Sequence, residues 1–150
     1  MQTTGKLIAR SVGSRLVEAI CVPREHVADV WPHVEGMIAQ AVNRTGINTI
    51  EDARVSVLAG YALLWVAWDG ETILGVATTE INETAKGRVC LIGYLSGKNL
   101  NEFFHLKDVL IDYAKSEKCA FLRIIGRKGW LRRLRNEGFK MSNIVMERPI

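Results

Sequence analysis

The sequence predicts a single domain of mixed α/β class, in which a mostly antiparallel central sheet is flanked by helices. Apolar runs of strand length alternate with segments in which apolar residues recur every three or four positions. Tight turn signals join three consecutive runs in the middle of the chain, which is typical of antiparallel strands. The sequence contains no internal repeat and no linker-like stretch, so we expect residues 1–150 to form one compact domain.

The first third of the chain is expected to hold one strand followed by one or two helices. Residues 12–22 contain an apolar run that ends at Pro23. Apolar residues then recur at helical spacing until Gly46, which is expected to end the helix. Thr49 has the character of an N-cap for a second helix, and Asp52 three residues later favours the positive end of that helix.

Three antiparallel strands are expected in the middle of the chain. Residues 62–68 form a strongly apolar run, and the Asp69-Gly70 pair after it is a strong signal for a tight hairpin. Residues 72–81 continue as the partner strand. A further turn at Lys86-Gly87 leads into a third strand at residues 88–95.

The remaining part of the chain predicts a crossover between two parallel strands. A helical pattern follows the turn at Ser96 and Gly97, and residues 120–125 form a second apolar run. A right-handed crossover would place that run beside the preceding strand. A short basic helix and a terminal strand complete the expected order. Because the start of a helix presents free backbone N–H groups, the glycine turn predicts a ligand that bears phosphate.

Composition limits the classes of protein to which the chain can belong. No segment approaches the roughly 20 apolar residues needed to span a bilayer, and the first ten residues resemble neither a signal peptide nor a transit peptide. The three cysteines lie far apart within or beside apolar runs, which matches neither a metal spacing nor a disulfide framework. We therefore expect buried thiols and a cytoplasmic protein.

Basic residues gather near the C-terminus. The net charge is only +4, but residues 123–140 hold seven Lys and Arg against the single acid Glu137. Such a cluster can attract a nucleotide, a nucleic acid or an acidic protein, and a solvated helix face is an equally good interpretation. His26 and His33 lie seven positions apart with no nearby Cys or clustered acids, so no metal site is expected.

Four segments carry a resemblance to a known family. They are LWVAWDGETILGVATTE at residues 64–80, GYLSG at residues 93–97, the expected helix with Asp112-Tyr113-Ala114, and GRKGW at residues 126–130, which is followed by Gly138-Phe139. With them the chain resembles GNAT-type N-acetyltransferase domains, most closely the small GNAT-like proteins of tailed-phage genomes. The resemblance implies an acetyl-CoA-dependent enzyme that acetylates a primary amine of a small molecule or protein, in the host cytoplasm if the chain is phage-encoded.

The resemblance also implies where the cofactor lies. The strand before the glycine turn splays from its parallel neighbour, and its backbone from Ile92 to Leu95 holds the pantetheine arm. Gly97 permits close backbone approach to the pyrophosphate, and the helix that follows adds its dipole. The positions implied to contact phosphate are Ser96, Gly97, Lys98, Asn99 and Leu100 for the pyrophosphate, and Arg127 and Lys128 for the adenosine phosphates. The family loop usually carries more than the one glycine found in SGKNLN.

Acetyl transfer to an amine needs a base that removes a proton and an acid that protonates the departing thiolate. Glu80 ends an otherwise apolar strand near the expected centre of the sheet, so it is the first candidate for the base, and Glu83 is the second. Many relatives place the acid, a tyrosine, on the last helix. Trp130 lies in that region here, so Tyr94 is the candidate acid.

Two other functions remain open from the sequence. The absent tyrosine and the reduced glycine loop are compatible with a non-catalytic GNAT-like module, such as a phage structural or host-interaction protein. The basic cluster at residues 123–140 is compatible with binding to nucleic acid.

Overall fold

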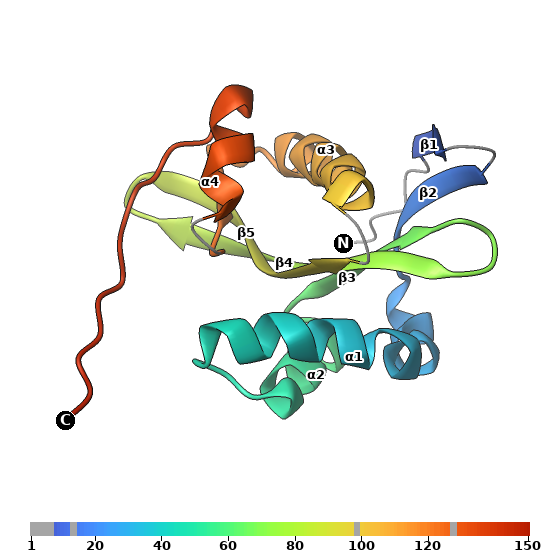
Figure 1. The fold of residues 1–150 in the computed structure, drawn as a ribbon, viewed down its shortest axis with the longest axis horizontal. Coiled ribbons are helices and arrows are strands. Elements are labelled where there is room, and N and C mark those ends of the chain that lie inside the picture. Colours follow the sequence, from blue (N-terminus) through green and yellow to red (C-terminus); the bar gives the residue numbers. More distant parts are fainter. Residues whose placement is uncertain (1–7, 13–14, 98–99, 127–128) are drawn as a thin grey trace.

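A six-stranded sheet forms the centre of the structure, with helices on both faces (Figure 1). This computed structural model describes residues 8–12, 15–97, 100–126 and 129–150. The strands follow one another across the sheet in sequence order: β1 (Ile8–Val12), β2 (Arg15–Cys21), β3 (Leu63–Trp68), β4 (Ile73–Thr84), β5 (Gly87–Gly97) and β6 (Phe121–Ile124). The helices are α1 (Val27–Thr45), α2 (Ile50–Leu58), α3 (Leu100–Ser116) and α4 (Gly129–Leu134), with short 3-10 turns η1 (Arg24–His26) and η2 (Arg135–Glu137).

The sheet is antiparallel except between β5 and β6, which are parallel and are connected through α3. Figure 1 shows α1 and α2 together below the sheet and α3 above it. These observations confirm the predicted mixed, mostly antiparallel sheet flanked by helices. We call the two sides of the sheet the α1/α2 face and the α3 face.

The sequence prediction differs from the structure at both ends of the chain. The strand expected within residues 12–22 is present as β2, but its antiparallel partner β1 was not predicted. The terminal strand expected after the short basic helix is also wrong, because residues 138–150 contain no strand. An apolar run becomes a strand only where another strand offers its backbone groups, and periodicity alone does not identify that partner.

Successive side chains along each strand point to opposite faces of the sheet, so the buried residues form two separate hydrophobic cores. Leu64 and Val66 of β3 point to the core under α1 and α2, while Trp65 between them points to the core under α3. The indole of Trp65 packs edge-on against Tyr113 of α3, with 5.0 Å between ring centroids. Its Nε1–H donates to Thr79 Oγ1 over 2.9 Å, so this buried polar group is satisfied. These contacts fasten α3 to the centre of the sheet.

The start of α2 carries the predicted N-cap. Thr49 Oγ1 accepts a hydrogen bond from the backbone N–H of Asp52, and the Asp52 carboxylate accepts one from the backbone N–H of Thr49. This reciprocal pair is a capping box, which satisfies two N–H groups that the helix cannot. Gly46 ends α1 with a φ of 64°, a left-handed conformation that favours glycine. Both local predictions are confirmed.

Thr49→Ala is expected to lower the free energy of unfolding by about 1 kcal/mol, because it removes the hydroxyl that caps α2. Thr49→Ser should retain most of the stability, since serine can make the same hydrogen bond. Urea unfolding of the three proteins measures the difference. Equal stability of the alanine and wild-type proteins would contradict the role of the cap.

Burial keeps two thiols protonated in the folded chain. It raises the pKa of Cys21 to about 11 and the pKa of Cys90 to about 12, from 9.0 for an exposed thiol. Burial also raises the pKa of the Cys119 thiol. The observed burial of Cys21 and Cys90 agrees with the expectation of buried thiols.

Because of the two raised pKa values, the free energy of unfolding depends on pH in the alkaline range. Because the folded state binds these protons more tightly, the stabilisation is complete below about pH 9 and is lost as the pH rises toward 11 and 12. We expect the free energy of unfolding to fall over this range in urea titrations. The variant with Cys21→Ala and Cys90→Ala should show a shallower fall, and an unchanged slope would contradict the contribution of the thiols.

None of the helices in the described part of the chain is both long enough and apolar enough to cross a membrane.

Candidate functional site

The strands β5 and β6 part partway along their length, next to the edge of the sheet. Their parallel pairing extends from Val89 and Phe121 to Ile92 and Ile124, after which β5 continues to Gly97. Within the described ranges, this continuation of β5 pairs only with β4. Its other edge therefore presents backbone N–H and C=O groups that can bind an extended ligand. The opening lies where the resemblance implies a splayed strand.

A bulge in β5 lies at the opening. Between two matched pairs, β5 holds one residue more than β4, so Gly93 and Tyr94 bulge from the regular ladder. The backbone N–H of Tyr94 donates to Thr78 Oγ1 over 3.1 Å. A Cβ atom at Gly93 would lie only 3.1 Å from the same hydroxyl oxygen, so glycine fits this position without strain. The Thr78 hydroxyl thus stabilises the bulge.

The side chains of Ile92 and Leu95 flank the bulge and point toward α3. Ile92 is buried in the α3-side core, and Leu95 packs against the same core. Ile92 is buried and Leu95 is half-buried, so at Ile92 only the backbone is available to a ligand. This is the role that the resemblance implies for Ile92.

Glu80 and Tyr94, the two candidate catalytic residues, lie on the same α1/α2 face. Glu80 is half-buried, and its Oε1 accepts a hydrogen bond from Ser56 Oγ of α2 over 3.4 Å. The Tyr94 oxygen accepts a hydrogen bond from Asn48 Nδ2, over 3.0 Å, in the connection between α1 and α2. A phenol that accepts this bond retains its own O–H proton for donation.

The spacing between Glu80 and the bulge is set by β4. Thr78, which bonds the Tyr94 backbone, lies two residues before Glu80 on the same strand and face. Two residues of strand correspond to about 7 Å. Glu80 with Ser56 and Tyr94 with Asn48 therefore form two polar pairs on the α1/α2 face, and we call these four residues together with Thr78 the polar cluster.

Ser96 and Gly97 complete β5 at the mouth of the opening. Ser96 is buried, and its Oγ has no hydrogen-bond partner among the described residues. A buried hydroxyl without a partner is uncommon and indicates capacity for a ligand contact. Gly97 is exposed, and α3 begins three residues later at Leu100. The remaining positions implied to contact phosphate lie outside the described residues: Lys98, Asn99, Arg127 and Lys128.

Glu83, the second candidate base, lies away from this cluster. It pairs with Arg88 in the ladder near the tight turn of the β4–β5 hairpin and forms an ion pair with Arg88 over 3.8 Å. Its side chain is 76% exposed. The structure therefore does not bring Glu83 together with Tyr94. The described members of the basic cluster are also exposed: Arg123, Arg132, Arg133, Arg135 and Lys140.

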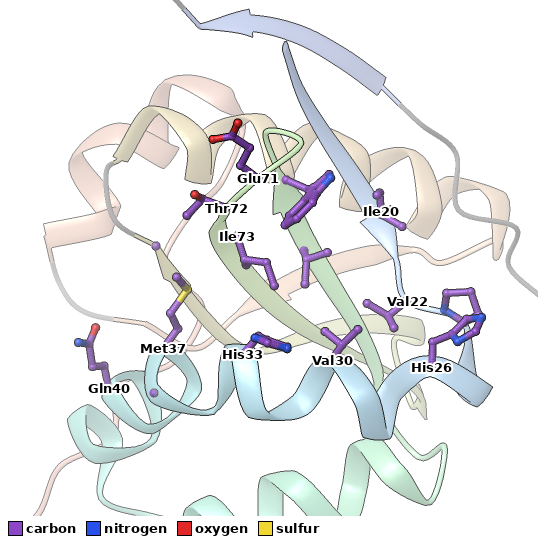
Figure 2. A pocket seen from close by; sticks show the side chains of 15 residues that line it. Ile20, Val22, His26, Val30, His33, Met37, Gln40, Glu71, Thr72 and Ile73 are labelled. Atoms are coloured by element: carbon purple, nitrogen blue, oxygen red, sulfur yellow. The ribbon is translucent and has the colours of Figure 1, made fainter. Parts of the chain in front are cut away.

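A cavity of about 1120 Å³ lies on the α1/α2 face, between α1 and strands β2 to β4 (Figure 2). Apolar side chains such as Val30, Met37 and Ile73 line it, together with polar groups that include His33 and Glu71. Neither Glu80 nor Tyr94 belongs to its lining, but Gly97 does. The cavity therefore reaches the C-terminal end of β5 and not the polar cluster.

The sequence did not indicate this cavity or the polar groups around Glu80. Ser56 lies 24 positions from Glu80, and Asn48 lies 46 positions from Tyr94. No motif joins such pairs, and only the packing of α1 and α2 on the sheet reveals them. Although His26 and His33 both line the cavity, no group of three or more His, Cys, Asp or Glu in the described ranges could hold a metal ion.

No protein-family model matches the sequence. No curated protein matches it either.

Solved structures show the fold clearly. An aminoglycoside acetyltransferase from an uncultured soil metagenomic sample, solved with sisomicin, is 11% identical, with a TM-score of 0.66 over 89% of this chain and 96% of that one. A predicted acetyltransferase from Clostridium acetobutylicum, solved with acetyl-CoA, is 12% identical to this chain. Its TM-score is 0.64, and the match covers 89% of this chain and 96% of that one. A ribosomal-protein-alanine N-acetyltransferase from Brucella melitensis biovar Abortus is 15% identical to this chain. Its TM-score is 0.61, and the match covers 89% of this chain and 97% of that one. The chain therefore has the GNAT fold.

Proposed function

We propose that this chain is an acetyl-CoA-dependent N-acetyltransferase that acts on a primary amine of a small molecule or protein. The observation that carries the proposal is the parting of β5 from β6 at the Gly93–Tyr94 bulge. It leaves one edge of β5 without a strand partner in the described chain, next to the polar cluster. The solved neighbours support the same reaction class, because they include acetyltransferases and one of them was solved with acetyl-CoA.

The residues at the opening fit acetyl-CoA. The unpaired edge of β5 offers N–H and C=O groups in the spacing of a strand, which suits the amides of a pantetheine arm. The Ser96 hydroxyl, which has no partner in the described ranges, adds a further polar contact. Gly97 lets the backbone approach the pyrophosphate, and the start of α3 adds a favourable dipole. When bound, acetyl-CoA supplies an acetyl group activated as a thioester.

Within the polar cluster, Glu80 acts as the base and Tyr94 as the acid. Glu80 removes a proton from the acceptor amine, directly or through water, because only the neutral amine is nucleophilic. Ser56 holds the carboxylate by its hydrogen bond. Tyr94 is oriented by Asn48 and donates its O–H proton to the departing thiolate. The two hydrogen bonds hold both groups on the α1/α2 face, from which the acceptor approaches.

The alternative function, a non-catalytic protein with this fold, is argued from the sequence of α4. Its sequence GWLRRL contains no tyrosine, and the ring of Trp130 lies over Gly126, at 3.4 Å from an added Cβ. A phage structural or host-interaction protein with this fold would bind acetyl-CoA weakly or not at all and would release no thiol with any amine. A panel of amines, scored by release of free thiol from acetyl-CoA, separates the two functions: release supports the enzyme, and no release with any amine supports the alternative.

Gly97→Trp is expected to weaken acetyl-CoA binding by about tenfold or more, which corresponds to about 1.4 kcal/mol. The indole would occupy the space that the pyrophosphate needs at the end of β5. Tyr61→Trp is the matched control, because Tyr61 is 78% exposed and lies outside the opening. Isothermal titration measures both affinities, and thermal unfolding checks that both variants are folded. Unchanged affinity in Gly97→Trp would place the pyrophosphate elsewhere.

A further inference from the structure

An open surface of the sheet lies beside Glu80 on the α1/α2 face. It is formed by Leu91 of β5 with Phe121 and Arg123 of β6, and we call these three residues the β5–β6 shelf. Their neighbours along the two strands pack in the core under α3: Cys90, Ile92, Leu122 and Ile124. Because side chains alternate along a strand, the side chains of the shelf point to the α1/α2 face.

The strand pairing places the shelf in line with Glu80. Glu80 of β4 pairs with Leu91 of β5, and Leu91 pairs in turn with Arg123 of β6. Neighbouring strands lie about 4.8 Å apart, so about 10 Å separates the backbones of Glu80 and Arg123. Phe121 lies two residues before Arg123 on the same face, about 7 Å along β6. A carboxylate, an apolar floor and a guanidinium therefore form one row across the sheet.

The shelf is open to solvent and borders the opening. Phe121 is 49% exposed, although phenylalanine is usually buried, and Arg123 is exposed as well. Leu91 is half-buried. It lies one residue before Ile92, whose pairing with Ile124 is the last between β5 and β6. A ligand on the shelf therefore lies next to the opening proposed for acetyl-CoA.

The charge of Arg123 is available to a ligand, because Arg123 forms no ion pair with another residue of the described ranges. Glu83 lies three residues after Glu80 on β4, so it points to the opposite face. There it forms an ion pair with Arg88, which also pairs with Glu117 beyond the end of α3. Among the described residues of β4 to β6, Glu80 and Arg123 are thus the charged side chains on the α1/α2 face.

Building on the proposed acetyltransferase function, on which this inference rests, we propose that the shelf binds a free α-amino acid with an apolar side chain as the acceptor. Its amine binds Glu80, its carboxylate binds Arg123, and its side chain packs on Leu91 and Phe121. The amine nitrogen and a carboxylate oxygen of an α-amino acid lie about 3 Å apart, and a hydrogen bond at each end adds about 3 Å. The ligand therefore fits the separation of about 10 Å across the row.

The transfer step uses groups that the site already contains. Glu80 takes one proton from the charged amine and passes it to water. The neutral nitrogen bonds to the acetyl carbonyl carbon, the carbon–sulfur bond of the thioester breaks, and Tyr94 gives its proton to the thiolate. A second proton from the nitrogen restores Tyr94, so the products are the N-acetylamino acid, coenzyme A and one proton. Arg123 positions the acceptor, because a guanidinium can bind a carboxylate through two parallel hydrogen bonds.

Isothermal titration of leucine into the full chain, with and without coenzyme A, tests the shelf directly. Leucinamide is the comparison ligand, because a neutral amide replaces its carboxylate, as in the first residue of a protein. Leucine should bind about tenfold or more tightly than leucinamide, and Arg123→Gln should remove this preference, since hydrogen bonds to charged groups are the stronger ones. No binding of leucine in either condition, equal binding of the two ligands, or a preference that survives Arg123→Gln overturns the proposal.

Arg44→Gln is the matched control for the charge. It removes the same charge from an exposed side chain in the last turn of α1, outside the shelf. This variant should keep the preference for leucine. Loss of the preference in Arg44→Gln would show that the net charge of the chain selects the carboxylate, against the proposal.

Phe121→Ser tests the apolar contact. It should weaken the binding of leucine and leave the binding of glycine unchanged, because glycine has no side chain to pack on the ring. Thermal unfolding checks that the variant is folded. Unchanged binding of leucine, or equal weakening for both amino acids, would contradict the contact with Phe121.

Thiol release from acetyl-CoA separates a failure of this proposal from a failure of the proposed function. Release with leucinamide that equals or exceeds release with leucine would leave the acetyltransferase function standing and overturn the choice of a free amino acid. Absence of release with any amine, together with leucine binding that depends on Arg123, would overturn the acetyltransferase function and leave the amino-acid site standing.

Discussion

Glu80→Gln is expected to lower kcat/KM for amine acetylation by about 10²- to 10⁴-fold, the usual contribution of a general base. The amide keeps the size of the side chain, and its oxygen can still accept the hydrogen bond from Ser56. It cannot take a proton from the amine, so the chemical step slows while the protein remains folded. Thiol release at varied amine concentration measures the effect, and isothermal titration should give an unchanged Kd for acetyl-CoA.

Glu83→Gln is the matched control for this experiment. It makes the same change on the same strand, at a side chain that is 76% exposed and ion-paired with Arg88. Its kcat/KM should equal that of the wild-type protein. Full activity in Glu80→Gln, or equal losses in the two variants, would show that the base is not Glu80.

Trp65→Ala is expected to lower the free energy of unfolding by about 3–5 kcal/mol, the usual cost of removing a large buried aromatic side chain. Trp65 is 2% exposed and packs edge-on against Tyr113. The substitution leaves a cavity between the sheet and α3. It also removes the Nε1–H that the Thr79 hydroxyl accepts. Urea unfolding followed by circular dichroism measures the loss.

Trp68→Ala provides the comparison within the same strand. Trp68 is only half-buried and lines the cavity beside α1, so its removal should cost less than that of Trp65. An equal or greater loss in Trp68→Ala would contradict the assignment of Trp65 as the side chain that fastens α3 to the sheet.

Local signals predicted the parts of the fold that depend on neighbouring residues. The Asp69-Gly70 pair predicted a hairpin, and in the structure Asp69 Oδ1 accepts hydrogen bonds from the backbone N–H groups of Glu71 and Thr72. Thr49 with Asp52 predicted a helix start in the same way. Each of these contacts spans two or three residues, so the sequence pattern contains all the groups involved.

The sequence pattern did not predict contacts between residues that lie far apart in the chain. The apolar character of residues 12–22 predicted a strand but not that β1 would pair with it, and the apolar C-terminus predicted a strand that has no partner within the described chain. The sequence offered Glu80 and Tyr94 as catalytic candidates by residue type and position. Their supporting partners, Ser56 and Asn48, depend on how α1 and α2 lie on the sheet, which no spacing in the sequence encodes.

Isothermal titration of the full chain with acetyl-CoA tests the proposed site most directly. The opening between β5 and β6 predicts saturable binding of one molecule per chain, with a Kd in the range of about 1 μM to 1 mM that is typical of enzyme substrates. Gly97→Trp should weaken that binding, and Tyr61→Trp should not. The absence of any binding heat at millimolar acetyl-CoA, with a chain shown to be folded, would contradict a cofactor site in this opening.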